Sequence, residues 1–425
     1  MTELLRLYFN RRSLALFLLG VASGLPLAIS GDFLAAWLTE RHIDFAHIGL
    51  IGLAGMPYAL KVLWAPLVDR YAPPFLGRRR GWIALSQVGL IGAILLLSLT
   101  HPAHSLPMVA LAATVVALLS ATQDIVIDAW RTDTLPPEER GPGAAVAVAG
   151  FRLGMIASGA GALILVGRFG LTWPQACRAT AGMMSIGLLG VALAPEPSVD
   201  ARPRSLVEAV VEPLQELMLR PGGWMILLFA LVFKLPEHIA GSMTLPFLLK
   251  LGLPMQQVGA VREGMGVAVT IFGAIVGGAI VSRAGLLRSL WMFGALHSLS
   301  NLAFLLLSES GASYGGMVAV VGIENFCIGL TTAAFVAWIM GQCDPRHSAF
   351  QFALLSSMMA LSRIACAPLS GWMANRLGWP MFFAVSATFG IPGLLLLPWM
   401  SGLGQDRQAP EISAIPPNLA MAAAE

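Results

Sequence analysis

The sequence predicts an all-α integral membrane protein with twelve transmembrane helices, arranged as two pseudo-symmetric six-helix bundles. Of the 425 residues, 57% are hydrophobic and only 12% are charged, and the mean hydropathy is +0.76. Soluble domains carry about 25% charged residues, so this composition excludes a water-soluble protein. The apolar stretches reach the roughly 20 residues that a helix needs to cross the hydrocarbon layer. The alternating pattern of transmembrane strands is absent from the sequence.

Hydropathy and helix-breaking residues place the spans in order along the chain. The first apolar run has no small-residue cleavage site followed by a soluble domain, so we expect it to remain as a membrane helix. The expected spans are 13–38, 46–68, 82–100, 106–131, 142–167, 175–194, 223–249, 257–281, 288–308, 314–340, 349–374 and 379–400.

Arginine and lysine residues concentrate in segments on one side of these spans, among them 6–12, 70–80 and 202–220. Because cytoplasmic loops are rich in these residues, both termini are expected in the cytoplasm. The net charge of +3 arises at membrane edges, which argues against a nucleic-acid-binding patch. No metal-ligand or disulfide spacing is found among the four cysteines, Cys177, Cys327, Cys343 and Cys366.

The expected organisation is a bundle, a linker, a second bundle and a tail. The first bundle covers 1–194, a cytoplasmic linker 195–222, the second bundle 223–400, and a disordered cytoplasmic tail 401–425. Within the linker, Ser205–Arg220 has helical spacing with glutamates on one side. We expect it to form an amphipathic helix on the cytoplasmic face.

The two halves resemble each other when one is shifted by 210 residues, from Leu25 to Leu235. The stretch "LPLAISGDFLAAWL" from Leu25 aligns with "LPEHIAGSMTLPFL" from Leu235, and Leu-Pro, Ile, Gly and Leu recur in register. Such a repeat is typical of transporters that bind their solute between the halves, near the midplane of the membrane. Pro26 and Pro236 occupy matched positions, and proline bends a membrane helix. We therefore favour a cavity at these bends over a purely structural role.

Ionisable residues inside the predicted spans point to function, because a charge in hydrocarbon costs several kcal/mol unless it is paired or hydrated. Asp124 and Asp128 are four residues apart and project from one helix face, with Gln123 beside them. The next span contributes Arg152, which we expect to face both carboxylates. For Asp124 we favour substrate binding or gating over a structural role.

The second half carries its own charges. Lys234 and Glu237 lie three residues apart beside Pro236, so they form either a local ion pair or the wall of a cavity. Glu324 has no cation within a helical turn, so burial favours its protonated form. This makes Glu324 the first candidate for the proton carrier, with Asp124 the second. The alternative for Glu324 is a carboxyl group hydrogen-bonded to a neighbouring helix.

The segment "PLVDRYAPPFLGRRRGW" joins the second and third spans and is a strong positive-inside signal. It resembles the loop signature of the major facilitator superfamily, in which an aspartate and a basic pair latch the cytoplasmic side. The resemblance implies a cytoplasmic gate formed by Asp69, Arg70, Arg78 and Arg79. Arg131 and Asp133 are expected to join helix ends at the same face and to touch water.

Several longer strings resemble one branch of that superfamily. They are "ASGLPLA", "FLAAWLT", "KVLWAPLVDRYAPPFLGRRRGW", "QDIVIDAWRTDTLPPEERGPGAAVAVAGFRLGM" and "FALLSSMMALSR". Together they make the chain similar, over about residues 10–400, to the AmpG family of muropeptide permeases. The resemblance implies proton-driven import of N-acetylglucosaminyl-1,6-anhydro-N-acetylmuramyl peptides across the bacterial inner membrane, without a cofactor. In that family the import supports peptidoglycan recycling and supplies the signal for β-lactamase induction.

The resemblance also implies a set of substrate-binding residues. Carboxylates of the ligand would pair with cations, and its sugars with amides and with aromatic rings such as Tyr58, Trp130 and Trp338. The implied polar positions are Lys61, Gln123, Asp124, Asp128, Arg152, Lys234, Glu324 and Asn325, together with Glu237, which stands where the family usually has aspartate.

Three other functions are alternatives to muropeptide import. The first is a transporter of the same fold for an acyl-CoA, a siderophore or a drug. The second is a non-transporting membrane scaffold or sensor, which the cost of so many intramembrane charges disfavours. The third is an enzyme, which is disfavoured because no Ser-His-Asp set, metal cluster or phosphate loop is present in the sequence. We expect a monomer surrounded by lipid, with a small-molecule substrate and no nucleic acid partner.

Overall fold

The computed structural model describes residues 6–44, 47, 51, 53–102, 105–197, 203–220 and 222–400. All regular secondary structure in these residues is helical. The expected disordered tail, 401–425, lies outside the described residues. Eleven helices in the described part of the chain are long and apolar enough to cross a membrane. The chain is therefore a multi-pass membrane protein.

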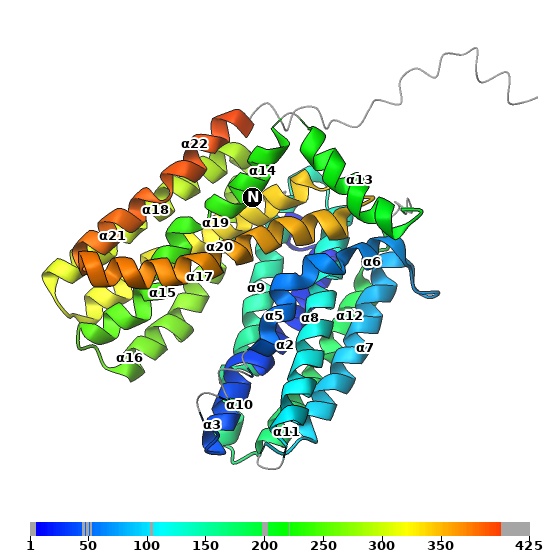
Figure 1. Ribbon diagram of the computed structural model, residues 1–425, viewed down its shortest axis with the longest axis horizontal. Helices are drawn as coiled ribbons and strands as arrows, with labels where there is room; N and C mark the ends of the chain where they lie inside the picture. The colour runs from blue at the N-terminus through cyan, green and yellow to red at the C-terminus, as the bar shows by residue number, and fades with distance from the viewer. Residues whose placement is uncertain are drawn as a thin grey trace, which may run out of the picture.

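The first bundle is built from the N-terminal half, blue to green in Figure 1. Several of its spans consist of two or more consecutive helical segments. Their bounds are α2 Arg11–Ala28, η1 Ile29–Phe33, α3 Leu34–Glu40, η2 Leu53–Gly55, α5 Met56–Leu60, η3 Lys61–Leu63, α6 Ala65–Arg70, α7 Arg78–Ser98, α8 Leu106–Thr134, η4 Pro137–Glu139, α9 Arg140–Ser158, α10 Ala160–Gly167, α11 Trp173–Met183 and α12 Ser185–Leu193.

A linker helix, α13 (Leu206–Leu219), leads to the second bundle. In that bundle α18, α19 and α20 are long and continuous, whereas the other spans are broken. The bounds are α14 Gly223–Val232, α15 Leu235–Lys250, α16 Met255–Gly259, η5 Ala260–Gly266, α17 Val267–Ala284, α18 Leu286–Ser310, α19 Tyr314–Gln342, α20 Ser348–Leu377, α21 Trp379–Thr388 and α22 Ile391–Met400.

The predicted spans agree with eleven of these helical stretches, and the largest difference at an end is the fifth span, predicted from residue 142 and observed from Pro137. The predicted span 46–68 corresponds to a shorter apolar stretch, Leu53–Leu63, and is not one continuous helix. In the described part of this range the chain forms only short segments, from η2 to α6. Pro57 and Pro66 each lie in the first turn of a new segment, where the missing N–H of proline is tolerated.

Both spans that carry the matched prolines are broken, as the repeat predicted, but at different points. After Pro26 the first span continues through the π-helical segment η1, where Gly31 has a non-helical backbone. The seventh span breaks before Pro236, at Phe233 and Lys234, and Pro236 lies in the first turn of α15. Each half therefore has a helix break close to its matched proline. The backbone geometry of the two breaks differs.

Small residues let α2 and α9 pack backbone against backbone. A Cβ atom on Gly24 would lie 2.1 Å from the carbonyl oxygen of Phe151, and one on Gly154 would lie 2.2 Å from that of Val21. These distances are far below any van der Waals contact, so only glycine allows this approach. The contact sets the positions of both helices and of the polar side chains that they carry.

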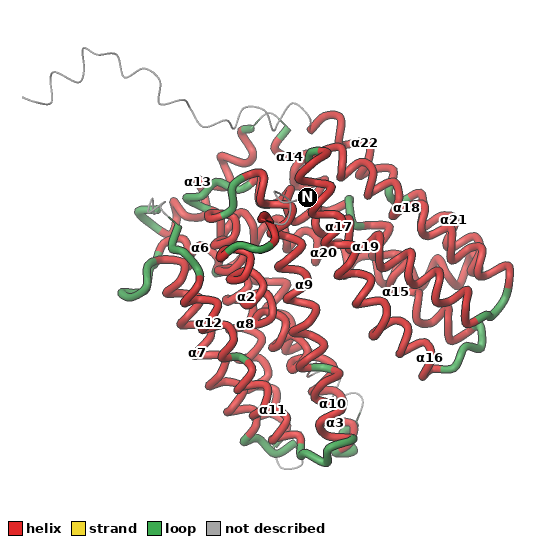
Figure 2. The backbone as a smooth tube through the Cα atoms, turned by 180° about the vertical axis from the view of Figure 1, so that it is seen from behind, coloured by secondary structure: helices red, strands yellow, loops and turns green. Residues whose placement is uncertain are grey.

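The two bundles converge at one end of the molecule and diverge toward the other (Figures 1 and 2). They meet through α6, α8 and α9 of the first bundle and α17, α19 and α20 of the second. At the diverging end, α10 and α11 pack against α9 and α7 of their own bundle. We call the converging end, near α6 and α13, the closed end, and the diverging end, near α11 and α16, the open end.

Candidate functional site

The acidic pair on α8 lies within the first bundle, and Asp128 holds two cations. Its carboxylate lies 2.8 Å from the guanidinium of Arg131 and 3.6 Å from Nζ of Lys61. Lys61 comes from η3, in the broken second span, so the irregular backbone there brings the ammonium group to α8. These side chains are 10–16% exposed, so the cluster is mostly desolvated and internally neutralised.

Asp124 lies one turn from Asp128 and binds a different partner. Its carboxylate accepts a hydrogen bond from the hydroxyl group of Ser23 on α2. Ser23, Asp124, Asp128 and Arg131 line a cavity of about 190 Å³ between α2, α8 and α9. Both aspartates therefore reach the same cavity from one face of α8.

The partner expected for the two aspartates was wrong. Arg152 is not paired with Asp124 or Asp128 in the described structure, and the cations on Asp128 are Lys61 and Arg131 instead. Arg152 lies within electrostatic range of Glu237 and Glu263, which belong to the second bundle. It therefore faces across the interface rather than into its own bundle.

Gln123 is fully buried on α8, and both polar atoms of its amide lack a hydrogen-bond partner in the described structure. A buried amide without partners is costly, and such groups often belong to sites that a ligand or water completes. The structure leaves Gln123 available for the role that the sequence predicted, next to Asp124.

In the second bundle, Lys234 is located at the break of the seventh span. Its ammonium group donates to Glu237 at 2.5 Å, and to the hydroxyl groups of Thr332 at 2.9 Å and Thr331 at 3.1 Å. The ion pair is local, as one of the two sequence interpretations expected. Lys234 also links the seventh span to α19, because both threonines lie on α19.

Sequence analysis missed the histidines that surround this pair. His297 on α18 is buried, with Nδ1 3.3 Å from the Thr331 hydroxyl group, while Nε2 has no partner in the described structure. His238 on α15 lies 3.2 Å from the hydroxyl group of Ser362 on α20. No regular spacing links these residues, so only the packing of four helices brings them together.

Glu324 and Asn325 are adjacent on α19 but lie in different surroundings. Glu324 is buried, accepts a 3.4 Å hydrogen bond from Thr244, and lies within electrostatic range of Arg262. The amide of Asn325 donates to the carbonyl group of Val321 and accepts from Thr270 on α17. Asn325 thus joins two helices, whereas Glu324 remains a weakly partnered buried acid.

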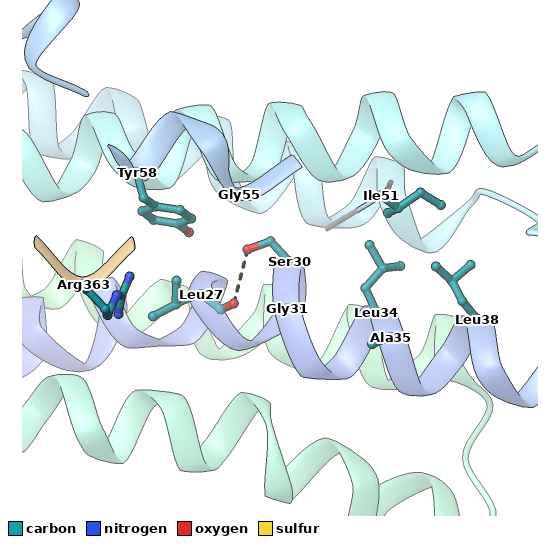
Figure 3. A pocket seen from close by; sticks show the side chains of 10 residues that line it. All are labelled: Leu27, Ser30, Gly31, Leu34, Ala35, Leu38, Ile51, Gly55, Tyr58 and Arg363. Carbon is teal, nitrogen blue, oxygen red and sulfur yellow. Dashed lines mark hydrogen bonds between the residues drawn. The ribbon is translucent and has the colours of Figure 1, made fainter. Parts of the chain in front are cut away.

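A larger cavity of about 360 Å³ lies between the first span, the second span and α20 (Figure 3). Tyr58 and the exposed side chain of Arg363 lie at one end, and Leu34, Leu38 and Ile51 at the other. The cavity therefore offers a cation and an aromatic ring beside an apolar surface. An anionic ligand with an apolar part fits this arrangement.

Of the three aromatic residues considered for sugar binding, Tyr58 lines the larger of the two cavities described above. Trp130 is buried and donates to the carbonyl oxygen of Pro195. Trp338 is buried against Phe229 and Phe335. Both tryptophans are therefore core residues.

At the closed end, Asp69 and Arg79 join the two bundles. Arg79 donates to Asp69 at 2.9 Å, to Asp133 at 2.8 Å, and to the hydroxyl group of Ser348 on α20 at 2.7 Å. The carboxylate of Asp69 also accepts the backbone N–H groups of Ala349 and Phe350, and so caps the start of α20. We call Asp69, Arg79, Asp133 and Ser348 the latch.

The remaining predicted gate residues differ in their surroundings. Arg78 lies 3.7 Å from Asp133 and donates to the carbonyl oxygen of Pro345 across the interface. Arg70 lies outside the latch, with its guanidinium group over the ring of Tyr71. The expectation that Asp133 touches water was wrong, since its side chain is fully buried between Arg78 and Arg79.

Arg131 and Tyr8 add contacts between the bundles near the latch. Arg131 is 8% exposed rather than solvated, and its guanidinium group lies 4.9 Å from the ring of Phe352 on α20. Tyr8, which precedes the first span, donates to the carbonyl oxygen of Ile275 at 2.7 Å. Burial raises the pKa of Tyr8 to about 12, so the phenol keeps its proton.

Comparison with known proteins decides the family. The model of the Major Facilitator Superfamily matches residues 13–340. The anhydromuropeptide permease of Escherichia coli K12 is 42% identical over 93% of this chain and 81% of its own length. The AmpG 4 transporter of Rickettsia conorii is 30% identical over 93% of this chain and 98% of its own.

The chain belongs to the AmpG family of the major facilitator superfamily.

The AmpG family and its superfamily consist of transporters, so this member is a membrane transporter and not an enzyme. The fold agrees with a solved structure, that of the human organic anion transporter MFSD10 (TETRAN). It superposes with a TM-score of 0.66 at 17% identity, covering 91% of this chain and 97% of that one. In this AmpG family member three groups of polar residues stand out. Lys61, Asp128 and Arg131 form the Asp128 cluster. Lys234, Glu237, His297, Thr331 and Thr332 form the Lys234 cluster, and the latch is the third group.

Proposed function

We propose that the protein imports N-acetylglucosaminyl-1,6-anhydro-N-acetylmuramyl peptides across the bacterial inner membrane, for peptidoglycan recycling. The observation that carries this proposal is the 42% identity to the E. coli anhydromuropeptide permease, which extends over 93% of the chain. Both ion clusters and the latch fall within that length. Import of these peptides would also supply the signal for β-lactamase induction.

The charges of the site support an anionic, partly sugar ligand. Lys61, Arg152, Lys234 and Arg363 are cations on four different elements of the two bundles. The free carboxylates of a muropeptide can pair with them. Gln123 and Tyr58 supply an amide and an aromatic ring of the kind that binds sugars. We propose Asp128, Glu237 and Asn325 as the residues that hold these groups in place.

Alternating access follows from the arrangement of the bundles. The latch joins them at the closed end, whereas they diverge at the open end (Figure 1). The excess of arginine and lysine on the side of the latch supports a cytoplasmic location for that end and for both termini. In this state the site faces the periplasm, and import requires the latch to open. Each bundle moves as a unit in this scheme, and the boundaries 1–194 and 223–400 describe the two units.

Coupling to the proton gradient requires an acid that binds and releases a proton inside the membrane. Glu324 is buried and Asp124 is partly buried, and neither has a direct ion pair in the described structure, whereas Asp128 and Glu237 are held by cations. We assign proton coupling to Glu324 and Asp124 for this reason. Both clusters and the latch come from one chain, so the transport unit is a monomer.

Uptake of labelled anhydro-muropeptide into right-side-out membrane vesicles tests the function. We expect uptake with an inside-alkaline pH gradient and no accumulation after a protonophore collapses it. Vesicles without the protein measure background entry. Accumulation that does not depend on the gradient would remove the proton from the mechanism. No uptake at all would favour another solute of the same fold, such as an acyl-CoA, a siderophore or a drug.

A further inference from the structure

The linker helix α13 presents three different faces. Ala209, Pro213 and Leu217 are buried against the rest of the protein. A second face, at spacings of three and four residues, is apolar yet exposed, from 37% to 71%: Val207, Val210, Val211, Leu214 and Met218. The third face carries the exposed polar residues Glu212 and Gln215, with the partly exposed Glu208 beside them. By the 3.6-residue period, the apolar face lies between the buried and the acidic faces.

Polar contacts attach the inner side of α13 to the closed end. Gln351, in the first turn of α20, donates to the carbonyl oxygen of Pro213 at 3.3 Å and to the carboxylate of Glu216 at 3.1 Å. Arg220 donates to the carbonyl oxygen of Gln342, the last residue of α19, at 3.0 Å. These contacts fix the rotation of α13 about its own axis. The apolar face is therefore exposed in the folded, docked helix.

The position of α13 indicates what covers that face. The helix contacts α6, α14 and α20, at the ends of three membrane spans. Exposed tryptophans mark the ends of spans on the same side: Trp224 begins α14, Trp291 lies in the first turns of α18, and Trp399 ends α22. Tryptophan is enriched at the membrane–water interface. The α13 helix therefore lies at the level of the lipid headgroups.

We propose that the apolar face of α13 binds the lipid bilayer, at the boundary between headgroups and acyl chains. The exposed apolar surface continues from the membrane spans onto α13, since α6 and α14 contact this helix and carry the exposed side chains of Leu67 and Trp224. On the acidic side, Gln215 is exposed, and the Glu212 side chain is half exposed although its carboxylate lies 3.4 Å from His347. A helix with this division of faces is suited to lie in the plane of the interface.

Quenching by spin-labelled lipids tests this proposal without using any transport substrate. Val211→Cys and Glu212→Cys place an environment-sensitive fluorophore on adjacent residues of the apolar and acidic faces. Both are reconstituted in phosphatidylethanolamine–phosphatidylglycerol liposomes, with the spin label near the headgroup or near the chain end. Unsubstituted protein reports any labelling of the four native cysteines, which are all buried.

We expect the headgroup-proximal spin label to quench the fluorophore at residue 211 several times more strongly than the one at residue 212. The chain-end label should have the smaller effect at residue 211. Equal quenching at the two residues would overturn the proposal. So would its absence at residue 211, which would point instead to a protein partner, since the liposomes contain none.

Discussion

The carboxylate of Asp69 accepts a 2.9 Å hydrogen bond from the backbone N–H group of Phe350, although 281 residues separate them in the chain. An aspartate of the first bundle thus caps a helix of the second. The first N–H groups of a helix lack partners within it and attract negative charge. The contact between Asp69 and the first turn of α20 therefore stabilises the closed state. When the latch opens, these N–H groups lose Asp69 and must bind water instead.

Replacing Arg79 should destabilise the closed state, because Arg79 is buried and paired with Asp69 and Asp133. Removing one partner from a buried ion pair costs about 3–5 kcal/mol. We expect Arg79→Gln to lower the thermal unfolding midpoint of the purified protein markedly. Arg70→Gln is the matched control, since it removes the same charge from outside the latch. Equal midpoints for the two variants would contradict this account of the latch.

Asp124→Asn should strongly reduce transport while the protein still inserts into the membrane. The substitution keeps a polar side chain beside Ser23 but removes the charge. Losing a charge-assisted hydrogen bond costs about 1.5–3 kcal/mol, which corresponds to a roughly 10- to 100-fold loss of uptake. Glu208→Gln, which removes the charge of a partly exposed residue of α13, is the control. Normal uptake by Asp124→Asn would give the aspartate a structural role only.

Glu324→Gln should separate binding from proton coupling. The amide keeps the shape of the buried side chain beside Thr244 but carries no ionisable proton. We expect exchange of labelled for unlabelled substrate across the membrane to continue, and accumulation driven by the pH gradient to disappear. Unchanged accumulation would exclude Glu324 as the coupling residue. Loss of exchange as well would place it in the binding site.

Arg363→Ala should weaken the binding of anionic substrates, because Arg363 lines the 360 Å³ cavity beside Tyr58. Hydrogen bonds to charged groups contribute about 1.5–3 kcal/mol, so KM should rise roughly 10- to 100-fold. Arg363→Lys should restore part of the affinity. Arg376→Ala, which removes an exposed arginine from the same helix, serves as the control. An unchanged KM would exclude the cavity from the substrate pathway.

If α13 lies on lipid, a charge on its apolar face should loosen the latch. Val211→Glu would force α13 away from the bilayer, and α13 supports the first turn of α20 through Gln351. We expect a lower unfolding midpoint in liposomes than for Gln215→Glu, which adds the same charge to the water-facing side. In detergent, where no bilayer is present, the difference should shrink. Equal midpoints in liposomes would show that the two features are independent.

Sequence analysis predicted the parts of the site that depend on one helix. The Asp124–Asp128 stacking follows from helical periodicity, and the Lys234–Glu237 pair from a spacing of three residues. The break of the seventh span near Lys234 was expected from Pro236. Each of these features depends only on residues close in the chain, so spacing was enough to predict it.

Contacts between helices could not be predicted in this way. Lys61 replaced Arg152 as the partner of Asp128, and His297 joined the Lys234 cluster without any sequence signal. Arg70 and Arg79 are equally basic residues of one loop segment, yet only Arg79 enters the latch. Their roles depend on which way each side chain points once the helices are packed.

Hydropathy and spacing were sufficient to predict the membrane class, eleven of the spans and the charges within them. Each of these features depends on the composition of a short stretch of sequence. The tertiary structure decided which charges pair, which end of the molecule is closed and which face of α13 is exposed. Those features depend on the tilt and rotation of whole helices. Backbone contacts such as Gly24 against Phe151 set that geometry, and they join residues more than a hundred positions apart.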